Sequence, residues 1–293
     1  MKPNHALCLD IGGGHVTSAL VDTALKSIVS GTGQRSETDP NASAKSLIGT
    51  WAEAGLDSLK GGNGFDLSHV GIAMPGPFDY QQGVSRMEHK FASLHGCDVR
   101  QLLREAWKDT LNCPIRFAND ADLFALGEYW AGAGRDTHRM IGVTLGTGLG
   151  SGFIENGRIL TKDSRIPDQG EIWNVPHKAG KAEDYANGEF LASLYEKRTG
   201  ECKEGREMAS LAMRGDRNAQ SCFHTLGENL VSILQPWVRS FSPDVLVFGG
   251  NLSKSFDLFA EAMRNGISIR CVRSAHFEDA SLYGGAALGL MVE

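Results

Sequence analysis

The first residues that could do chemistry are an aspartate and the three glycines that follow it closely. Asp10 is separated by one residue from Gly12, Gly13 and Gly14. Residues without side chains let backbone N–H groups close on phosphate oxygens, and an aspartate beside such a turn can hold Mg²⁺ through a water molecule. A plain hairpin turn explains the same residues. The motif is not a dinucleotide fingerprint, because a strand and not a helix is expected to follow it.

A second glycine turn repeats this arrangement farther along the chain. The hydroxyl residues Thr144 and Thr147 alternate with Gly146 and Gly148. This turn offers further hydrogen-bond donors for the far side of a triphosphate. Two such turns are much less expected by chance than one, and they suggest duplicated halves.

A third glycine motif, Gly249-Gly250-Asn251, ends an apolar run of the fully buried type. A flat pair of glycines could support a purine or a ribose. A simple connection between a strand and a helix is the other interpretation.

The pair Asn119-Asp120 stands where a short apolar run ends and a helical pattern begins. Ligands of α/β proteins bind at this end of the strands, and a carboxylate there can accept the proton of an attacking hydroxyl. Both residue types also cap helices well. The pair is therefore a helix N-cap, a catalytic site, or one of each.

Each of these motifs is expected to follow the end of a strand, and some of them to precede a helix. Strands are predicted at 6–11, 16–21, 27–31, 70–74, 115–118, 140–145, 153–159, 245–248 and 267–272. Two hairpins are expected, one from 6–11 and 16–21 and one from 140–145 and 153–159, the second with its glycine turn at 148–152. Helices are predicted at 44–59, 99–111, 120–129, 186–199, 204–214, 218–241, 256–265 and 284–290. Strands that alternate with helices indicate an α/β protein with a substantial sheet in each half.

The composition excludes several classes of protein. The 293 residues suggest roughly two domains. The net charge of -6 argues against nucleic acid as a main partner, and no run approaches the ~18 apolar residues of a membrane span. The six cysteines include no Cys-x-x-Cys pair, so they are expected to be reduced thiols of a cytoplasmic protein.

Together the motifs resemble the ROK family of sugar kinases and regulators, within the actin-like and hexokinase-like ATPase superfamily. The resemblance covers nearly the whole chain, and it depends on the order and spacing of Asp10-Ile11-Gly12-Gly13, 71–77, 118–121 with Gly127-Glu128, 145–150, 170–172 and 249–251. It implies an α/β, two-lobed actin-like ATPase (ribonuclease H-like) fold with an active-site cleft between the lobes. The expected N-terminal lobe is 1–118 plus 277–293, and the C-terminal lobe is 119–276.

The resemblance also implies roles for individual residues. Asp120 would be the general base for the sugar hydroxyl that attacks the γ-phosphate of ATP. Substrate contacts are implied for Asn119, Glu171, Asn174, Glu183 and Gly76. Nucleotide contacts are implied for Asp10, Gly12, Gly13, Gly14, Thr144, Gly146, Thr147, Gly148, Gly249, Gly250 and Asn251, and Asp10 would also hold Mg²⁺ through water. Without the resemblance, a lone glutamate on a loop is ordinary solvated charge.

The chain departs from the family pattern in the sugar loop. Trp173-Asn174 stands where the family has Gly-His, and the segment 178–182 lacks the family's cysteines. We therefore expect no zinc site, and we expect Asn174 to replace the histidine as a partner of the sugar. Between residues 83 and 96 the family's sugar-contacting residues are also replaced. Lys90 in this segment indicates either an anionic or substituted sugar or a solvated lysine.

These features predict an ATP-dependent sugar kinase that phosphorylates a hydroxyl of a hexose or an N-acetylhexosamine and, as is common in the family, forms a homodimer. The alternative is a catalytically silent sugar-binding or sugar-sensing protein of the same family. A DNA-binding regulator is not expected, because only nine residues precede Asp10 and the pI is acidic.

Overall fold

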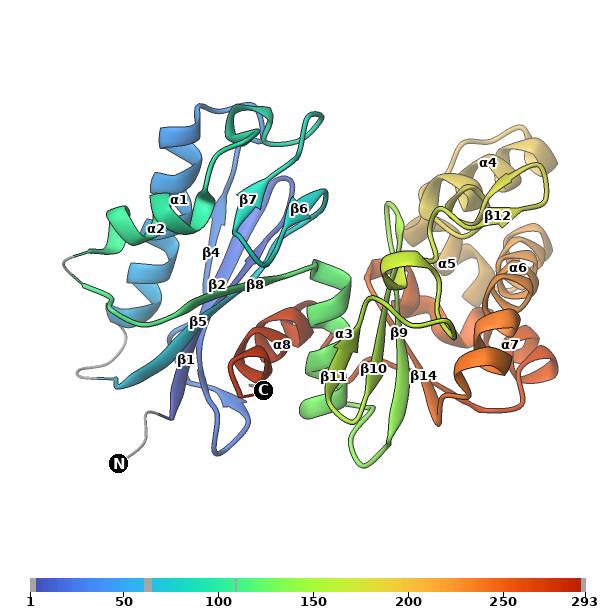
Figure 1. Cartoon of the computed structure of the whole chain (residues 1–293). Coiled ribbons are helices and arrows are strands. Elements are labelled where there is room, and N and C mark those ends of the chain that lie inside the picture. Colours follow the sequence, from blue (N-terminus) through green and yellow to red (C-terminus); the bar gives the residue numbers. More distant parts are fainter. Residues whose placement is uncertain (1–3, 61–64, 109, 291–293) are drawn as a thin grey trace. The chain divides into compact units, whose positions relative to one another are not determined.

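The computed structural model describes residues 4–60, 65–108 and 110–290. Contacts divide the chain into two compact units, Met1–Ala131 with Asp279–Glu293, and Gly132–Glu278. Each unit is built on one mixed sheet with helices beside it (Figure 1). No helix within the described ranges is both long enough and apolar enough to cross a membrane.

The sheet of the first unit brings three of the motifs to one edge. Its order is β3-β2-β1-β5-β8, and β4 pairs with β2. The bounds are β1 (His5–Ile11), β2 (His15–Asp22), β3 (Ser27–Ile28), β4 (Gln34–Glu37), β5 (Leu67–Ala73) and β8 (Ile115–Ala118). Strand β2 is antiparallel to β1, as the predicted hairpin requires, whereas β5 is parallel to β1 and β8 is parallel to β5. The residues that follow β1, β5 and β8 therefore lie along the same edge of the sheet.

Side chains alternate between the two faces of this sheet. Leu7 and Leu9 belong to the core that includes α1 and α2, whereas Ala6 and Cys8 pack with residues of α8. The helices are α1 (Ala44–Lys60), α2 (Val99–Trp107), α3 (Asp120–Trp130) and α8 (Ala280–Leu288), and shorter elements are β6 (Phe78–Asp79), β7 (Val84–Ser85), η1 (Ala92–Leu94) and η5 (Phe277–Asp279). Both faces of the sheet are thus covered by helices of the same unit.

Helices α3 and α8 touch through glycines. A Cβ on Gly284 would overlap the carbonyl oxygen of Leu123, and a Cβ on Gly127 would overlap that of Ala280. Only glycine allows backbones to approach this closely. The unit boundary consequently falls after α3, at Ala131. The expected lobe boundary at residue 118 differs, because it leaves this packing of α3 out of account.

His69 is buried in β5 beside α8. Its Nε2 lies 3.0 Å from the carbonyl oxygen of Gly285, to which the neutral ring donates. Burial lowers the pKa of His69 below its ordinary value of 6.5. The unfolded chain therefore binds a proton more readily than the folded chain does as the pH falls below that value.

We expect the free energy of unfolding to fall between pH 7 and pH 5.5, and to fall less in His69→Gln. The folded-state pKa is depressed, so the contribution of neutral His69 is complete above the unfolded pKa and is lost as the pH falls toward the folded pKa. Urea unfolding at the two pH values measures this difference. An equal loss of unfolding free energy in the wild type and in His69→Gln would contradict the assignment of this pH dependence to His69.

The sheet of the second unit repeats the arrangement of the first. Its order is β11-β10-β9-β14-β15, and its strands are β9 (Arg139–Leu145), β10 (Leu149–Glu155), β11 (Arg158–Leu160), β14 (Val245–Gly249) and β15 (Arg270–Arg273). Strand β10 is antiparallel to β9, as the second predicted hairpin requires, and β14 is parallel to β9. The glycines that follow β9 and β14 therefore lie at the same edge.

Helices of the second unit pack on a core that contains Phe153, Phe223 and Phe248. They are α4 (Gly188–Thr199), α5 (Gly205–Met213), α6 (Arg217–Phe241) and α7 (Ala260–Gly266), with the short elements η2 (Asp168–Gly170), β12 (Pro176–His177), β13 (Gly180–Lys181), η3 (Ala182–Tyr185) and η4 (Asn251–Leu258). Two helix predictions need correction. Residues 251–258 are 3₁₀-helical, so the helix predicted at 256–265 begins only at Ala260, and α8 begins at Ala280 instead of residue 284.

Candidate functional site

Asp10 is the last residue but one of β1, and only Ile11 separates it from the glycine turn at the edge of the first sheet. The turn is closed by a hydrogen bond from the N–H of Gly12 to the carbonyl oxygen of His15, at 2.9 Å, and the N–H of Thr38 donates to the carbonyl oxygen of Gly14 at 3.0 Å. No atom lies within 4 Å of the position that a Cβ on Gly14 would occupy. The turn therefore has free space on the side where a phosphate would approach.

Three charged groups of the first unit act on Asp10. Burial, first, and the negative charge of Asp120, second, together raise the pKa of Asp10 to about 7. Lys90 and Arg35 lower it, in that order. The carboxylates of Asp10 and Asp120 are thus close enough to repel each other, and they do so in the presence of two cations.

The structure assigns the predicted capping role of the Asn119-Asp120 pair to Asn119. Asn119 is the N-cap of α3, and its side chain accepts a hydrogen bond from the N–H of Ala121 at 2.9 Å. Asp120 is the first helical residue and is exposed. One of its oxygens, Oδ1, accepts from the same N–H at 2.9 Å. Because Asn119 supplies the cap, the Asp120 carboxylate is not required for that purpose.

Tyr80 connects two of the predicted substrate residues. Its hydroxyl donates to the carbonyl oxygen of Met74 at 3.1 Å and accepts from Nδ2 of Asn119 at 3.2 Å. A Cβ on Gly76 would lie 3.5 Å from the same hydroxyl. Gly76 and Asn119 are therefore neighbours, as expected for residues that follow adjacent parallel strands.

The second unit places its glycine turns side by side. Gly250 has a φ of 78°, which favours glycine, and a Cβ there would overlap the carbonyl oxygen of Leu145 at the end of β9. Nothing lies within 4 Å of the corresponding position on Gly146. The N–H of Gly188, the first residue of α4, donates to the carbonyl oxygen of Gly146 at 2.9 Å. The two predicted nucleotide motifs of this unit therefore lie side by side.

Glu183 lies against this turn. Its Oε2 accepts a hydrogen bond from the N–H of Leu149 at 3.0 Å, and a Cβ on Gly148 would lie 2.6 Å from the same oxygen. The glycine at position 148 thus leaves room for the glutamate. A predicted sugar residue and a predicted phosphate residue are in direct contact.

A chain of contacts joins Glu183 to Glu171. Lys181 Nζ lies 3.4 Å from Glu183 Oε1 and 4.6 Å from the centre of the Trp173 ring. Trp173 Nε1 donates to Glu171 Oε2 at 2.9 Å. The two predicted sugar carboxylates therefore lie in one neighbourhood, and Trp173 and Lys181 hold them there.

Lys178 ties the same loop to the helices of the second unit. Its Nζ donates to Asn229 Oδ1 and lies 5.1 Å from the centre of the Tyr185 ring. Asn174, by contrast, is exposed on the loop. In the described part of the chain no group of three or more His, Cys, Asp or Glu side chains could hold a metal ion.

The remaining predicted nucleotide residues lie within or next to the strands and glycine turns of the second unit. Thr144 lies in β9 opposite Gly150, whereas Thr147 and Asn251 are exposed beside their glycines, and Gly249 is the buried last residue of β14. Sequence reasoning missed Arg35, Tyr80 and Lys181. None of the three belongs to a motif, and each reaches its site only through the fold.

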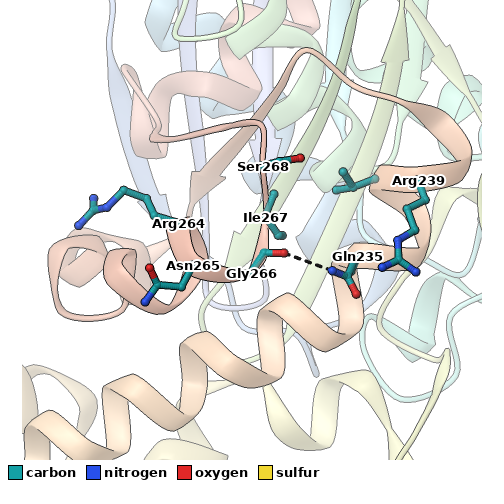
Figure 2. Close-up of a pocket in the computed structure, with 8 residues that line it drawn as sticks. Gln235, Arg239, Arg264, Asn265, Gly266, Ile267 and Ser268 are labelled. Atoms are coloured by element: carbon teal, nitrogen blue, oxygen red, sulfur yellow. Dashed lines mark hydrogen bonds between the residues drawn. The ribbon is translucent and has the colours of Figure 1, made fainter.

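A separate pocket of about 350 Å³ lies between the end of α6 and the segment after α7. Gln235 Nε2 donates to the carbonyl oxygen of Gly266 across it at 3.2 Å. Figure 2 shows Arg264 and Arg239 extending to opposite sides, so their guanidinium groups do not converge on one ligand. None of the predicted site residues lines this pocket.

The residues present fit a nucleotide phosphate and its metal ion. The free space over Gly14 and Gly146 admits phosphate oxygens to backbone N–H groups. Asp10 supplies the type of oxygen ligand that Mg²⁺ takes, directly or through water. Two related sheets that each carry a glycine turn with a carboxylate beside it are typical of the actin-like ATPase fold.

The chain belongs to the ROK family: the model of that family matches residues 6–283. Among curated proteins, the chain is 25% identical over 263 residues to the glucokinase of Thermotoga maritima. The aligned region covers 78% of this chain and 81% of that protein. The chain is 26% identical over 312 residues to the N-acetyl-D-glucosamine kinase of Haemophilus influenzae, over 96% and 98% of the two chains.

A solved structure shows the same fold. The ROK family glucokinase from Streptomyces griseus, in complex with glucose and AMPPNP, matches 97% of this chain and 98% of its own with a TM-score of 0.77 at 22% identity. The two-lobed actin-like ATPase fold expected from the sequence is therefore confirmed. So is the membership of the ROK family.

Proposed function

We propose that this chain is an ATP-dependent sugar kinase that phosphorylates a hydroxyl of a hexose or an N-acetylhexosamine, with Asp120 as the general base. One observation carries the assignment of the base. Asp120 is an exposed carboxylate at the sheet edge that also holds Asp10 and the glycine turn, and Asn119 relieves it of capping the helix. The family supports the remainder of the proposal, because both curated relatives above are named as sugar kinases.

In the proposed reaction, a hydroxyl oxygen of the sugar forms a bond to the γ-phosphorus of ATP while the bond from that phosphorus to the β,γ-bridging oxygen breaks. The proton of the hydroxyl passes to the carboxylate of Asp120, and the electron pair of the broken bond leaves with ADP. Mg²⁺, when bound, would offset negative charge on the phosphates. Asp10 would hold it through water, and the backbone N–H groups of both glycine turns would bind phosphate oxygens.

The sugar would be held by carboxylate and amide side chains. Glu171 and Glu183 can each accept hydrogen bonds from sugar hydroxyls. Lys181 and Trp173 keep the two carboxylates in place. Asn119, Gly76 and Asn174 complete the proposed contacts. The names of the relatives, a glucokinase and an N-acetyl-D-glucosamine kinase, support the class of sugar.

The test is ADP release with Mg-ATP across a panel of hexoses, 2-acetamido sugars and sugar acids, with the sugar omitted as the blank. We expect turnover with at least one neutral hexose or acetamido sugar and a phosphorylated sugar detectable by phosphorus NMR. Binding of a sugar without turnover for any member of the panel would favour the silent sugar-binding protein. A chain that binds neither nucleotide nor sugar would contradict both functions.

The expected homodimer stays a prediction, which the molar mass in solution tests. The cytoplasmic location is likewise a proposal. Its support is that all six cysteines are free thiols.

A further inference from the structure

Lys90 lies over the glycine turn of the first unit. A Cβ on Gly13 would lie 2.8 Å from Lys90 Cε and 3.2 Å from Lys90 Nζ. The side chain is half-buried. The glycine at position 13 therefore provides room for this lysine, and the end of the lysine side chain reaches the turn where a phosphate is expected.

The segment that carries Lys90 is held in place by the core. Phe91 is completely buried, and its ring meets that of Trp51 edge-on at 5.2 Å. Its N–H donates to the carbonyl oxygen of Pro40 at 3.2 Å, and Ser93 Oγ donates to that of Ala42 at 2.7 Å. Phe91 also has a φ of 53°, a left-handed conformation that bulky residues rarely adopt. The backbone beside Lys90 is thus strongly constrained, and such strain is concentrated at functional sites.

The charge of Lys90 is not neutralised by contact with a carboxylate. Among the residues that the structure describes, Lys90 forms no salt bridge, and its Nζ lies 5.6 Å from the centre of the Phe91 ring. Its positive charge acts on Asp10 and lowers the pKa of that carboxyl. A cation that lies beside backbone N–H groups and forms no salt bridge is suited to bind an anion.

We propose that Lys90 is a catalytic residue whose ammonium group binds the phosphoryl group during its transfer. This inference rests on the function proposed above. Lys90 forms no covalent bond and keeps its proton. It binds the equatorial oxygens of the phosphoryl group while the sugar oxygen bonds to phosphorus, the hydroxyl proton moves to Asp120 and the electron pair leaves with ADP. A cation there stabilises negative charge that develops in the transition state.

The position over Gly13 favours this role over recognition of an anionic sugar, because the contact is with the phosphate turn itself. The two roles separate in kinetics. A residue that binds the transferred group affects kcat with every sugar. A residue that selects an anionic sugar affects KM for that sugar alone.

The experiment compares the wild-type chain with Lys90→Met, Lys90→Arg and a control, Lys26→Met. Lys26 belongs to the same unit and also lies over an aromatic ring, with Nζ 5.2 Å from the centre of Trp130, but it contacts no predicted site residue. For the sugar found in the panel, we expect Lys90→Met to lower kcat by about 10²–10³-fold. We expect Lys90→Arg to recover part of the loss and Lys26→Met to retain wild-type kcat.

Binding provides a second readout that needs no turnover. Calorimetry with AMPPNP and with ADP should show that Lys90→Met loses affinity for AMPPNP at least about tenfold more than for ADP, because only AMPPNP carries the terminal phosphate. An unchanged preference between the two nucleotides would overturn the proposal. Wild-type kcat of Lys90→Met on neutral sugars would also overturn it, even if the variant were impaired with an anionic sugar. Absence of nucleotide binding in the wild-type chain would instead overturn the proposed kinase function.

Discussion

Asp120→Asn is expected to lower kcat by about 10²–10⁴-fold, the usual contribution of a general base. Asparagine keeps the size of the side chain, and it can still accept the hydrogen bond from the N–H of Ala121 that Asp120 Oδ1 accepts. The helix should therefore start in the same place, and the KM for ATP should change much less than kcat. Initial rates of ADP release over a range of both substrates measure the two effects separately.

The matched control is Asp98→Asn. Asp98 is exposed and caps α2 in the same unit, where its Oδ1 accepts from the N–H of Gln101 at 2.9 Å. This variant makes the same change of charge at another helix start, and asparagine caps equally well. We expect wild-type kcat for it. If Asp120→Asn retained kcat within about threefold of the wild type, Asp120 would not be the base.

Gly284→Ala is expected to reduce the free energy of unfolding by about 1–3 kcal/mol or more, the cost of overpacking a well-packed interior. The added Cβ would overlap the carbonyl oxygen of Leu123 in α3, which is backbone and cannot rotate away. Helices α3 and α8 would have to separate, and α3 begins with the Asn119-Asp120 pair. Urea unfolding measures the loss, and activity at a temperature where the variant is folded measures any effect on the site.

Gly49→Ala is the control for this prediction. Gly49 lies within α1, is exposed, and has nothing within 4 Å of the position of an added Cβ. Alanine favours the helix by about 0.8–1 kcal/mol over glycine. The two identical substitutions should therefore change stability in opposite directions. A gain of stability in Gly284→Ala would contradict the close packing of α3 on α8, and a loss in Gly49→Ala would show that the added Cβ itself is costly in a helix of this unit.

The local motifs were predictable because each is short and begins at the end of a strand. The turns after Asp10 and Thr144 were located from glycines in sequence, and the pairing of β1 with β2 and of β9 with β10 confirms the hairpins. The cap at Asn119 follows from residue type and position alone. Each of these features depends on residues only a few positions apart.

Features that depend on distant pairing were not predictable in this way. Arg35 reaches Asp10 only because β4 pairs with β2 in a register that places it opposite Thr17. Glu183 meets Gly148 across 35 residues of sequence, although the resemblance had assigned them to different ligands. The start of α8 was placed too late, since the sequence pattern did not reveal that residues 280–283 are buried against the first sheet and α3.

The first unit is discontinuous in sequence, and this affects how the chain folds during its synthesis. Ala6, Cys8, Ala19 and Val21 pack against α8, which the ribosome makes only after the whole of residues 132–278. One apolar face of the first sheet must therefore wait uncovered while the second unit is translated and folds. Chains with such a face exposed are prone to aggregate or to engage chaperones, so slow translation through the second unit would lengthen the period in which the nascent protein is most vulnerable.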